Sequence, residues 1–215
     1  MGRENIVHHK DLEYFEEYPA PVMQKIHAGH YTNINSTIPF FGPMLYFLIR
    51  AIGCENVLEI GMAEGYTAYY MAHAIKDNAI RYQMYGNMYY GIDIAQVERT
   101  IAKLSSEELA FKCYELDSML LPGPLAGIKF DLIFQDGNHD KEHVVSEFKA
   151  MYPQLKGDGK GYWIAHDCFG PALEGFKEIK RMIDDGQYNM EYCQIWDVYG
   201  IAIMRKMEPD VQSAS

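Results

Sequence analysis

Short apolar runs of strand length alternate along this chain with longer segments whose apolar residues recur at helical spacing. The strand patterns begin at Val57 and return at residues 88–94, 110–116, 130–135 and 162–165. The helical patterns lie between and after them, at residues 66–76, 95–104, 139–152 and 171–185. Two further strand patterns, at residues 190–196 and 199–204, are close enough to form a hairpin. The chain is therefore predicted to alternate strands with helices and to end in a β-hairpin.

Alternating strand and helix units predict an α/β fold: a mostly parallel sheet with helices on both faces and an antiparallel edge from the C-terminal hairpin. In such sheets, ligands bind beyond the carboxyl ends of the strands, where the strand order reverses. Glycine or acidic residues directly follow the apolar part of successive predicted strands, namely Gly61, Asp93, Asp117, Asp136 and Asp167. We therefore expect a single binding rim that contains all of them.

The stretch VLEIGMAEGYTAYYMA, residues 57–72, joins the first predicted strand to a helix through a turn bracketed by Gly61 and Gly65. Glycine adopts positive φ readily and lets a ligand approach the backbone, while the start of the helix offers unpaired N–H groups to an anion. The third glycine of a dinucleotide fingerprint is missing, which disfavours a nicotinamide-dependent oxidoreductase. Glu59 and Asp93 suit a ligand with an amino-acid tail and a ribose. The pattern resembles the S-adenosylmethionine (SAM) site of class I methyltransferases, whose sheet is Rossmann-like and seven-stranded. An ordinary turn without a cofactor is the simpler alternative.

A length of 215 residues with 48% hydrophobic content predicts one domain with one substantial core. We assign residues 46–207 to that domain, residues 1–45 to an N-terminal helical cap and residues 208–215 to a flexible tail. Residues 1–17 are polar and charged, unlike a signal peptide, and no apolar run is long enough to cross a bilayer. These features predict a soluble, cytoplasmic protein that does not act on membranes. Four scattered cysteines without a CxxC pair predict reduced thiols.

The formal charge of −11 and the pI of about 5.1 argue against nucleic acid as a partner, because phosphate backbones are bound mainly by Lys and Arg. The acidic excess is spread along the chain, which is typical of a solvated surface. It also leaves carboxylates available for a divalent cation.

Asp136 opens DGNHDKEH after one predicted strand, and Asp167 follows YWIAH after the next, so the two acids are expected to face each other. Paired carboxylates suit Mg²⁺, which polarises a substrate hydroxyl and lowers its pKa. A cap or loop hydrogen bond is the simpler interpretation of either acid alone. His139 is our candidate general base, since an unperturbed imidazole has a pKa near 6.5. His166 is a candidate metal ligand, second base or structural histidine, and His143, one helical turn after His139, is expected either to flank the site or to lie on a solvated helix face.

Two segments carry a closer resemblance, which covers about residues 37–205. TIPFFGPMLYFLIRAIGCENVLEIGMAEGYTAYYMA resembles the opening of catechol and caffeoyl-CoA O-methyltransferases, and DLIFQDGNHDKEHVVSEF is similar to a related group that modifies sugar hydroxyls of macrolides and other natural products. In the catechol type, the acid after strand four binds metal and a Lys three residues later is the base. Asp136 matches that acid and His139 occupies the Lys position, as in the macrolide-sugar type. Catechol-type enzymes follow their strand-five Asp with Asn, whereas Cys168 follows Asp167 here, so the full ligand set stays open.

The same resemblance implies a set of SAM-binding residues. Glu59, Gly61, Gly65 and Thr67 are expected around the amino-acid end of SAM, Asp93 at the ribose hydroxyls, and Asp117 with Ser118 beside the adenine. The expected metal ligands are Asp136 and Asp167, with His166 as a further candidate.

These observations predict a SAM-dependent O-methyltransferase that methylates a hydroxyl of a small metabolite, such as a natural-product sugar or a catechol-like acceptor, with the help of Mg²⁺. The alternatives are a metal-independent N- or O-methyltransferase with a His base and a SAM-binding protein without catalysis. The cap is interpreted as a lid, a dimer contact or helices that simply cover the sheet. The Tyr- and Met-rich residues 78–90 are interpreted as a partner surface, a β-hairpin or core filling, and a homodimer is plausible. The sequence does not identify the acceptor, because binding loops have no transferable code.

Overall fold

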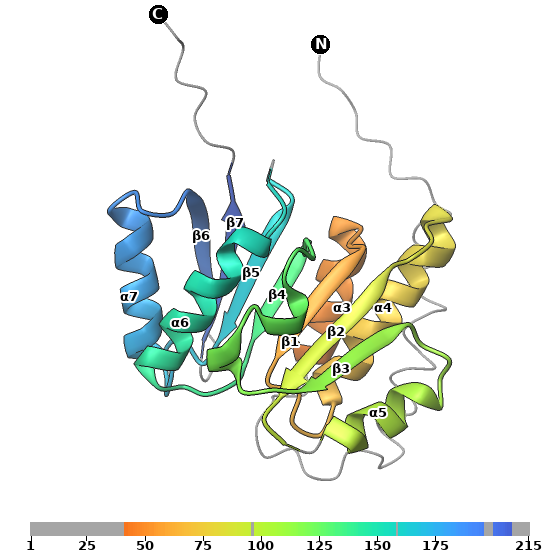
Figure 1. Ribbon diagram of the computed structural model, residues 1–215. Coiled ribbons are helices and arrows are strands. Elements are labelled where there is room, and N and C mark those ends of the chain that lie inside the picture. The colour runs from red at the N-terminus through yellow and green to blue at the C-terminus, as the bar shows by residue number, and fades with distance from the viewer. Residues whose placement is uncertain (1–40, 96, 158, 196–199, 208–215) are drawn as a thin grey trace, which may run out of the picture. The chain divides into compact units, whose positions relative to one another are not determined.

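The computed structural model describes residues 41–95, 97–157, 159–195 and 200–207 (Figure 1). The predicted cap, residues 1–45, lies outside the described residues except for its last five, which open a helix. The predicted tail, residues 208–215, also lies outside them. Both remain predictions.

The described chain forms one seven-stranded sheet with the order β3-β2-β1-β4-β5-β7-β6 (Figure 1). Its strands are β1 (Asn56–Ile60), β2 (Met88–Asp93), β3 (Phe111–Glu115), β4 (Leu132–Gln135), β5 (Gly161–His166), β6 (Met190–Ile195) and β7 (Ile201–Lys206). Strands β1 to β5 pair in parallel, and β7 pairs antiparallel with both β5 and β6. The predicted Rossmann-like sheet and its terminal hairpin are confirmed. One detail differs: β7 inserts beside β5, so the antiparallel strand lies inside the sheet and β6 forms the edge.

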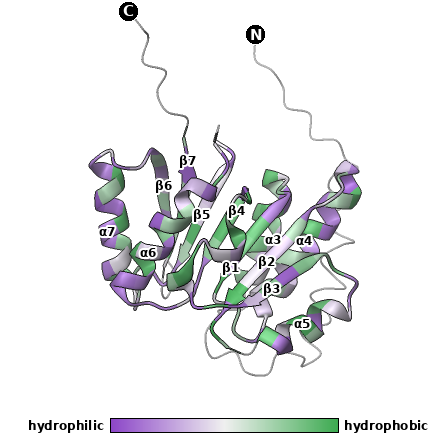
Figure 2. Cartoon of the chain, viewed as in Figure 1, coloured by the Kyte–Doolittle hydropathy of each residue, from purple (hydrophilic) through white to green (hydrophobic). Residues whose placement is uncertain are grey.

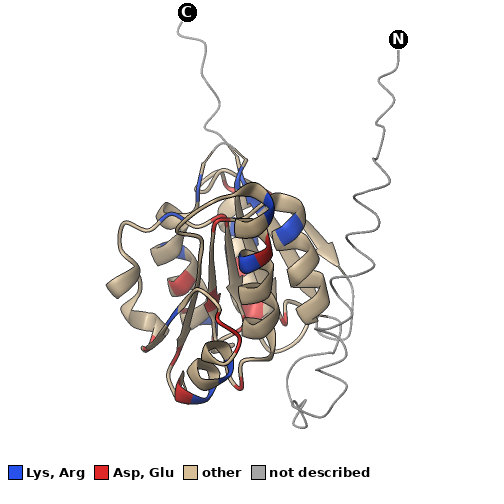
Figure 3. Cartoon of the chain, turned by 90° about the vertical axis from the view of Figure 1, so that its right-hand side faces the viewer, with Lys and Arg blue, Asp and Glu red and all other residues tan. Residues whose placement is uncertain are grey.

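Within the described residues, five α-helices cover the sheet, with α3, α4 and α5 in contact in series on one face and α6 with α7 on the other (Figure 1). Their bounds are α3 (Phe41–Ile52), α4 (Tyr66–Tyr82), α5 (Val97–Ser105), α6 (Lys141–Met151) and α7 (Leu173–Asp184). Polar and apolar bands alternate along α7 in Figure 2, because Phe176, Ile179 and Met182 recur at three-residue spacing and are buried. In the view of Figure 3, helices lie on both sides of the sheet and charges of both signs are interspersed over them.

Buried polar contacts hold α3 against α4, and an aromatic contact holds the start of α3 at the end of β5. The Tyr46 hydroxyl donates to Asp77 Oδ2 at 2.5 Å, and Arg50 Nη1 donates to Asn78 Oδ1 at 2.7 Å. At the start of α3, Phe41 packs edge-on against His166 at the end of β5, with ring centroids 4.3 Å apart. Helix α3 therefore reaches the carboxyl ends of the strands.

Among the described residues, no helix combines the length and the apolar character that a membrane crossing needs. All four cysteines are described and are free thiols, with Cys54 and Cys168 buried.

Candidate functional site

The carboxyl ends of β1 and β4 meet at Gly61. Its φ is +89°, and a Cβ on this residue would lie 2.3 Å from the Asp136 main-chain oxygen and 2.7 Å from Gly137 Cα. Main-chain hydrogen bonds hold the two ends in place, from Gly61 N to Ile92 O and from Asp136 N to Ile60 O, both at 2.9 Å. Only glycine satisfies both the dihedral and the close approach, so this residue lets the two loops lie side by side.

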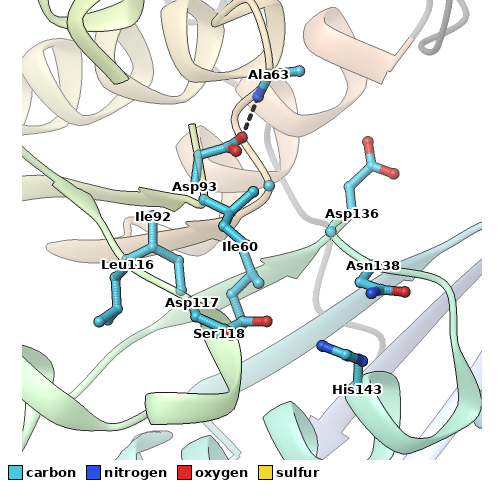
Figure 4. Close-up of a pocket in the computed structure, with 13 residues that line it drawn as sticks. Ile60, Ala63, Ile92, Asp93, Leu116, Asp117, Ser118, Asp136, Asn138 and His143 are labelled. Atoms are coloured by element: carbon cyan, nitrogen blue, oxygen red, sulfur yellow. Dashed lines mark hydrogen bonds between the residues drawn. The ribbon is translucent and has the colours of Figure 1, made fainter. Parts of the chain in front are cut away.

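Asp93 holds the turn that follows β1. Its Oδ2 accepts a hydrogen bond from Ala63 N at 2.7 Å (Figure 4), and its Oδ1 accepts one from Ala95 N at 3.2 Å. Ala63 has a φ of +44°, which is unusual for a residue with a side chain. The acid at the end of β2 therefore stabilises the backbone of the glycine turn.

A cavity of about 330 Å³ opens between these strand ends. Figure 4 shows Asp93, Asp117 and Ser118 on one side of it and Asp136 and Asn138 on the other. The remaining lining residues are Ile60, Gly61, Ala63, Ile92, Ile94, Leu116, Gly137 and His143. Of the residues predicted to bind SAM, the structure brings Gly61, Asp93, Asp117 and Ser118 together around this space.

Glu59, Gly65 and Thr67, which were also predicted to bind SAM, are not among the lining residues. Successive side chains of a strand point to opposite faces, so Glu59 faces away from the cavity that Ile60 lines. Glu59 is fully buried and accepts hydrogen bonds from the Thr67 and Tyr89 hydroxyls. Burial raises the pKa of its carboxyl to about 8. The observed contacts of Glu59 tie β1 to α4 and β2, and its contact with SAM stays a prediction.

A network of buried polar side chains supports the side of the cavity that Asp117 and Ser118 form. The sequence analysis did not predict its members Glu147, Gln135 and Trp163. Asp117 caps the short 3-10 helix η2 (Ser118–Leu120) by accepting from Met119 N at 2.9 Å. The Ser118 side chain interacts with the Glu147 carboxyl, whose pKa is raised by burial. Gln135 Nε2 donates to Glu147, and Trp163 Nε1 donates to Gln135 Oε1 at 3.1 Å. The available signal was an acid on the apolar face of α6, next to Phe148 and one turn after Val144.

Beside the cavity lies a cluster of two carboxylates and two imidazoles. His139 Nε2 is 2.9 Å from Asp167 Oδ2 and 4.0 Å from Asp136 Oδ1. His166 Nδ1 is 2.8 Å from Asp136 Oδ1 and 3.5 Å from Asp167 Oδ1. One ligand atom each from Asp136, His139 and Asp167 lie within 4.8 Å of one another, a separation suited to a shared metal ion. The predicted metal and base residues are therefore brought together.

The two imidazoles have different surroundings. The carboxylates of Asp136 and Asp167 raise the pKa of His139 to about 10, so without a cation this imidazole is protonated at neutral pH. The His166 side chain has no exposed surface and packs against Phe41 and Phe134. His166 therefore supports Asp136 from the interior.

Cys168 directly follows Asp167, where the resemblance to catechol-type enzymes leads us to expect Asn. Its Sγ is buried and donates to Ala165 O at 3.2 Å. Within the described residues, the group whose spacing could hold a metal ion consists of Asp136, His139 and Asp167 and does not include Cys168.

Comparison with known proteins finds a matching family model, curated relatives and solved structures of similar fold. A family model described as "Methyltransferase domain" matches residues 58–168. Caffeoyl-CoA O-methyltransferase 2 of Petunia hybrida is 30% identical over 156 residues, which cover 69% of this chain and 62% of that protein. The chain thus spans about three fifths of the length of the curated relatives it matches.

Two crystal structures are similar in fold. The O-methyltransferase of Bacillus cereus in complex with SAH has a TM-score of 0.63 at 16% identity and covers 85% of this chain and 88% of its own. The O-methyltransferase TomG of Streptomyces achromogenes, involved in tomaymycin synthesis and in complex with SAM, has a TM-score of 0.65 at 16% identity, with coverages of 84% and 86%.

Proposed function

Because the chain belongs to the class I SAM-dependent methyltransferases, we propose that it transfers a methyl group from SAM to a hydroxyl group of a small metabolite with the help of a divalent cation. When bound, SAM supplies an electrophilic methyl group to the acceptor oxygen and leaves as S-adenosylhomocysteine. The protein's part is to hold both reactants in line and to favour loss of the hydroxyl proton.

The cavity at the strand ends fits SAM in size and charge. Its volume of about 330 Å³ falls at the lower end of the range for small-molecule sites. Asp93, Asp117 and Asp136 give it a negative lining, which suits the sulfonium and ammonium groups of SAM. Asp93 lines the cavity beside the glycine turn, which it holds through Ala63 N, and this position supports its predicted contact with the ribose.

The Asp136 and Asp167 carboxylates fit a divalent cation. Their side chains are only 14% and 10% exposed, and like charges this close and this buried need a positive partner, which a divalent cation would supply in place of the proton on His139. When bound there, a cation polarises the acceptor hydroxyl and lowers its pKa. Mg²⁺ is the cation that the sequence predicts for paired carboxylates.

One observation carries the proposal. Asp136 lines the large cavity and also belongs to the cluster with His139 and Asp167. A methyl donor in the cavity and an acceptor oxygen at the cluster would therefore both lie next to Asp136.

The metal-free alternative fits the site less well. A His139 with a pKa of about 10 already carries its proton at neutral pH and cannot accept another. The buried His166 has no exposed surface that an acceptor could contact. His139 or His166 could therefore act as the base only after the charge on the neighbouring carboxylates had changed.

The same cluster supports an acceptor with two adjacent hydroxyl groups. Adjacent hydroxyls of a catechol or a sugar offer two oxygen ligands to one cation, which fixes the reacting oxygen in place. The Petunia relative is named for a caffeoyl-CoA substrate, which supports a catechol-like acceptor.

Methyl transfer from labelled SAM tests the proposal. The full chain is incubated with a panel of catechols and sugar-bearing metabolites, with added divalent cation or with chelator. We expect transfer to at least one acceptor and its loss with chelator. Turnover that is unchanged with excess chelator would contradict the role of the cation.

Asp136→Asn is the matched test of the residue. It removes the charge but keeps the shape, so we expect transfer to be lost while SAM binding is largely retained, because Asp93 and Asp117 still give the cavity a negative lining. Asp140→Asn is the control with the same change in charge, because Asp140 is exposed and its side chain makes no cap hydrogen bond. Equal activity of the two variants would overturn the assignment of Asp136.

A further inference from the structure

The reactive nitrogen of His139 points into the carboxylate cluster. The His139 side chain is 38% exposed, yet its Nε2 atom is buried, and no described acceptor is aligned for a hydrogen bond with it. It nevertheless lies 2.9 Å from Asp167 Oδ2. A base that takes a proton from an acceptor needs its nitrogen on the substrate side. Here the exposed part of the ring is elsewhere, and Nε2 faces the two acids.

The distances around Nε2 fit donor atoms that share one ion. First-row divalent ions hold nitrogen and oxygen ligands at about 2.0–2.2 Å, so two ligands of one ion lie at most about 4.4 Å apart. The separations from His139 Nε2 to the Asp167 and Asp136 oxygens, 2.9 and 4.0 Å, both fall within this limit. The three side chains therefore need little movement to bind the same ion.

The surrounding residues hold two of these ligands and leave room for a third. His166 Nδ1 fixes Asp136 Oδ1 at 2.8 Å from inside the protein, as an outer partner of a metal-binding carboxylate does. Cys168, at the position of the catechol-type Asn, directs its Sγ hydrogen to Ala165 O. His139 is thus the described side chain that completes the set with Asp136 and Asp167.

We propose that His139 Nε2 is the third protein ligand of the cation, and that the site therefore prefers a first-row transition ion such as Co²⁺, Mn²⁺ or Zn²⁺ to Mg²⁺. An imidazole suits these ions, whereas Mg²⁺ favours an all-oxygen shell. The inference rests on the cation-assisted function proposed above. It gives His139 a role different from the base predicted from the sequence. The acceptor hydroxyl, its pKa lowered by the cation, then loses its proton to solvent water.

Proton NMR of the full chain loaded with Co²⁺ tests the ligand directly, without turnover. A histidine bound to this paramagnetic ion gives an exchangeable ring N–H signal far outside the normal spectral range. We expect such a signal in the wild-type protein, its loss in D₂O and its absence in His139→Gln. A wild-type protein that binds Co²⁺ without this signal would overturn the inference.

Calorimetric titration measures the preference between ions. We expect His139→Gln to weaken Co²⁺ binding by at least about tenfold, since even outer partners of metal ligands are worth about 10- to 100-fold. Mg²⁺ binding should change by much less. His143→Gln is the control, because His143 lies one helical turn away and is outside the ligand group.

The outcomes separate this inference from the proposed function. No loss of either affinity in His139→Gln overturns the ligand role, and equal loss of Co²⁺ and Mg²⁺ affinity overturns the preference for a transition ion; both outcomes leave the cation-assisted transferase in place. Absence of any cation binding by the wild-type protein overturns both the ligand role and the cation's part in catalysis. SAM binding then still tests the transferase itself.

Discussion

Replacing Gly61 with alanine tests the close contact between the ends of β1 and β4. The new methyl group would lie 2.3 Å from the Asp136 main-chain oxygen, and the φ of +89° is unfavourable for alanine. The dihedral alone costs about 1–2 kcal/mol. Forcing extra volume into a packed site adds about 1–3 kcal/mol, because here the neighbour is backbone that cannot rotate away.

Gly86→Ala separates these two effects. Gly86 has nearly the same φ, +91°, but it is exposed, and no other described heavy atom lies within 4 Å of a Cβ placed there. Its substitution should cost only the dihedral part. We therefore expect Gly61→Ala to lower the free energy of unfolding by about 2–5 kcal/mol and Gly86→Ala by about 1–2 kcal/mol.

Urea unfolding at equilibrium measures both variants, and thermal melts should agree at about 2–4 °C per kcal/mol for a protein of this size. Because the contact is with Asp136, Gly61→Ala should also weaken cation binding, whereas Gly86→Ala should not. Equal losses of stability in the two variants would refute the reasoning, since the close approach would then have no cost.

Three further substitutions test other parts of the site and its support. Asp93→Ala removes a cavity carboxylate that accepts a hydrogen bond from Ala63 N. SAM affinity measured by calorimetry should fall by about 10- to 100-fold, which is the worth of a charged hydrogen bond. An unchanged affinity would show that Asp93 is not part of the SAM site. Glu59 has a pKa of about 8 in the folded protein, above its unfolded value, so the folded state retains a proton that the unfolded state loses; stability should decline as pH rises from about 4.5 to 8 and level off above. Glu59→Gln should reduce this decline in thermal melts at pH 5–9, and parallel curves for both proteins would contradict the assignment. Asp131→Ala should cost about 1.5–3 kcal/mol in urea unfolding, because Oδ2 accepts from two main-chain N–H groups and Oδ1 pairs with Lys156, whereas the exposed Asp184→Ala should cost about 0.5 kcal/mol or less.

Much of the rim could be predicted from the sequence because one rule fixes it. In a parallel sheet, residues that follow successive strands share an edge, and this rule placed Gly61, Asp93, Asp117 and Asp136 around one cavity. The rule concerns strand ends, so it does not extend to Glu59, which lies within β1 and points to the opposite face.

Other features depend on long-range packing that a single sequence does not encode locally. The hairpin was recognisable from two neighbouring strand patterns, but the insertion of β7 beside β5 depends on their cross-strand contacts. Glu147 is recognisable in the sequence only as an acid on the apolar face of its helix, and its contacts with Ser118 and Gln135 follow from how α6 packs on β4 and β5. The position of His139 Nε2, 2.9 Å from Asp167 Oδ2, likewise depends on a contact between the loops that follow β4 and β5.

Calorimetric titration of the full chain with SAM tests the central claim most directly, because the proposed methyl transfer depends on the cavity between β1, β2 and β4 being the methyl donor's site. Asp93→Ala serves as the site-specific variant. The account predicts micromolar binding at a single site in the wild-type protein and a clear loss in the variant. Absence of SAM binding by the folded wild-type protein would contradict it.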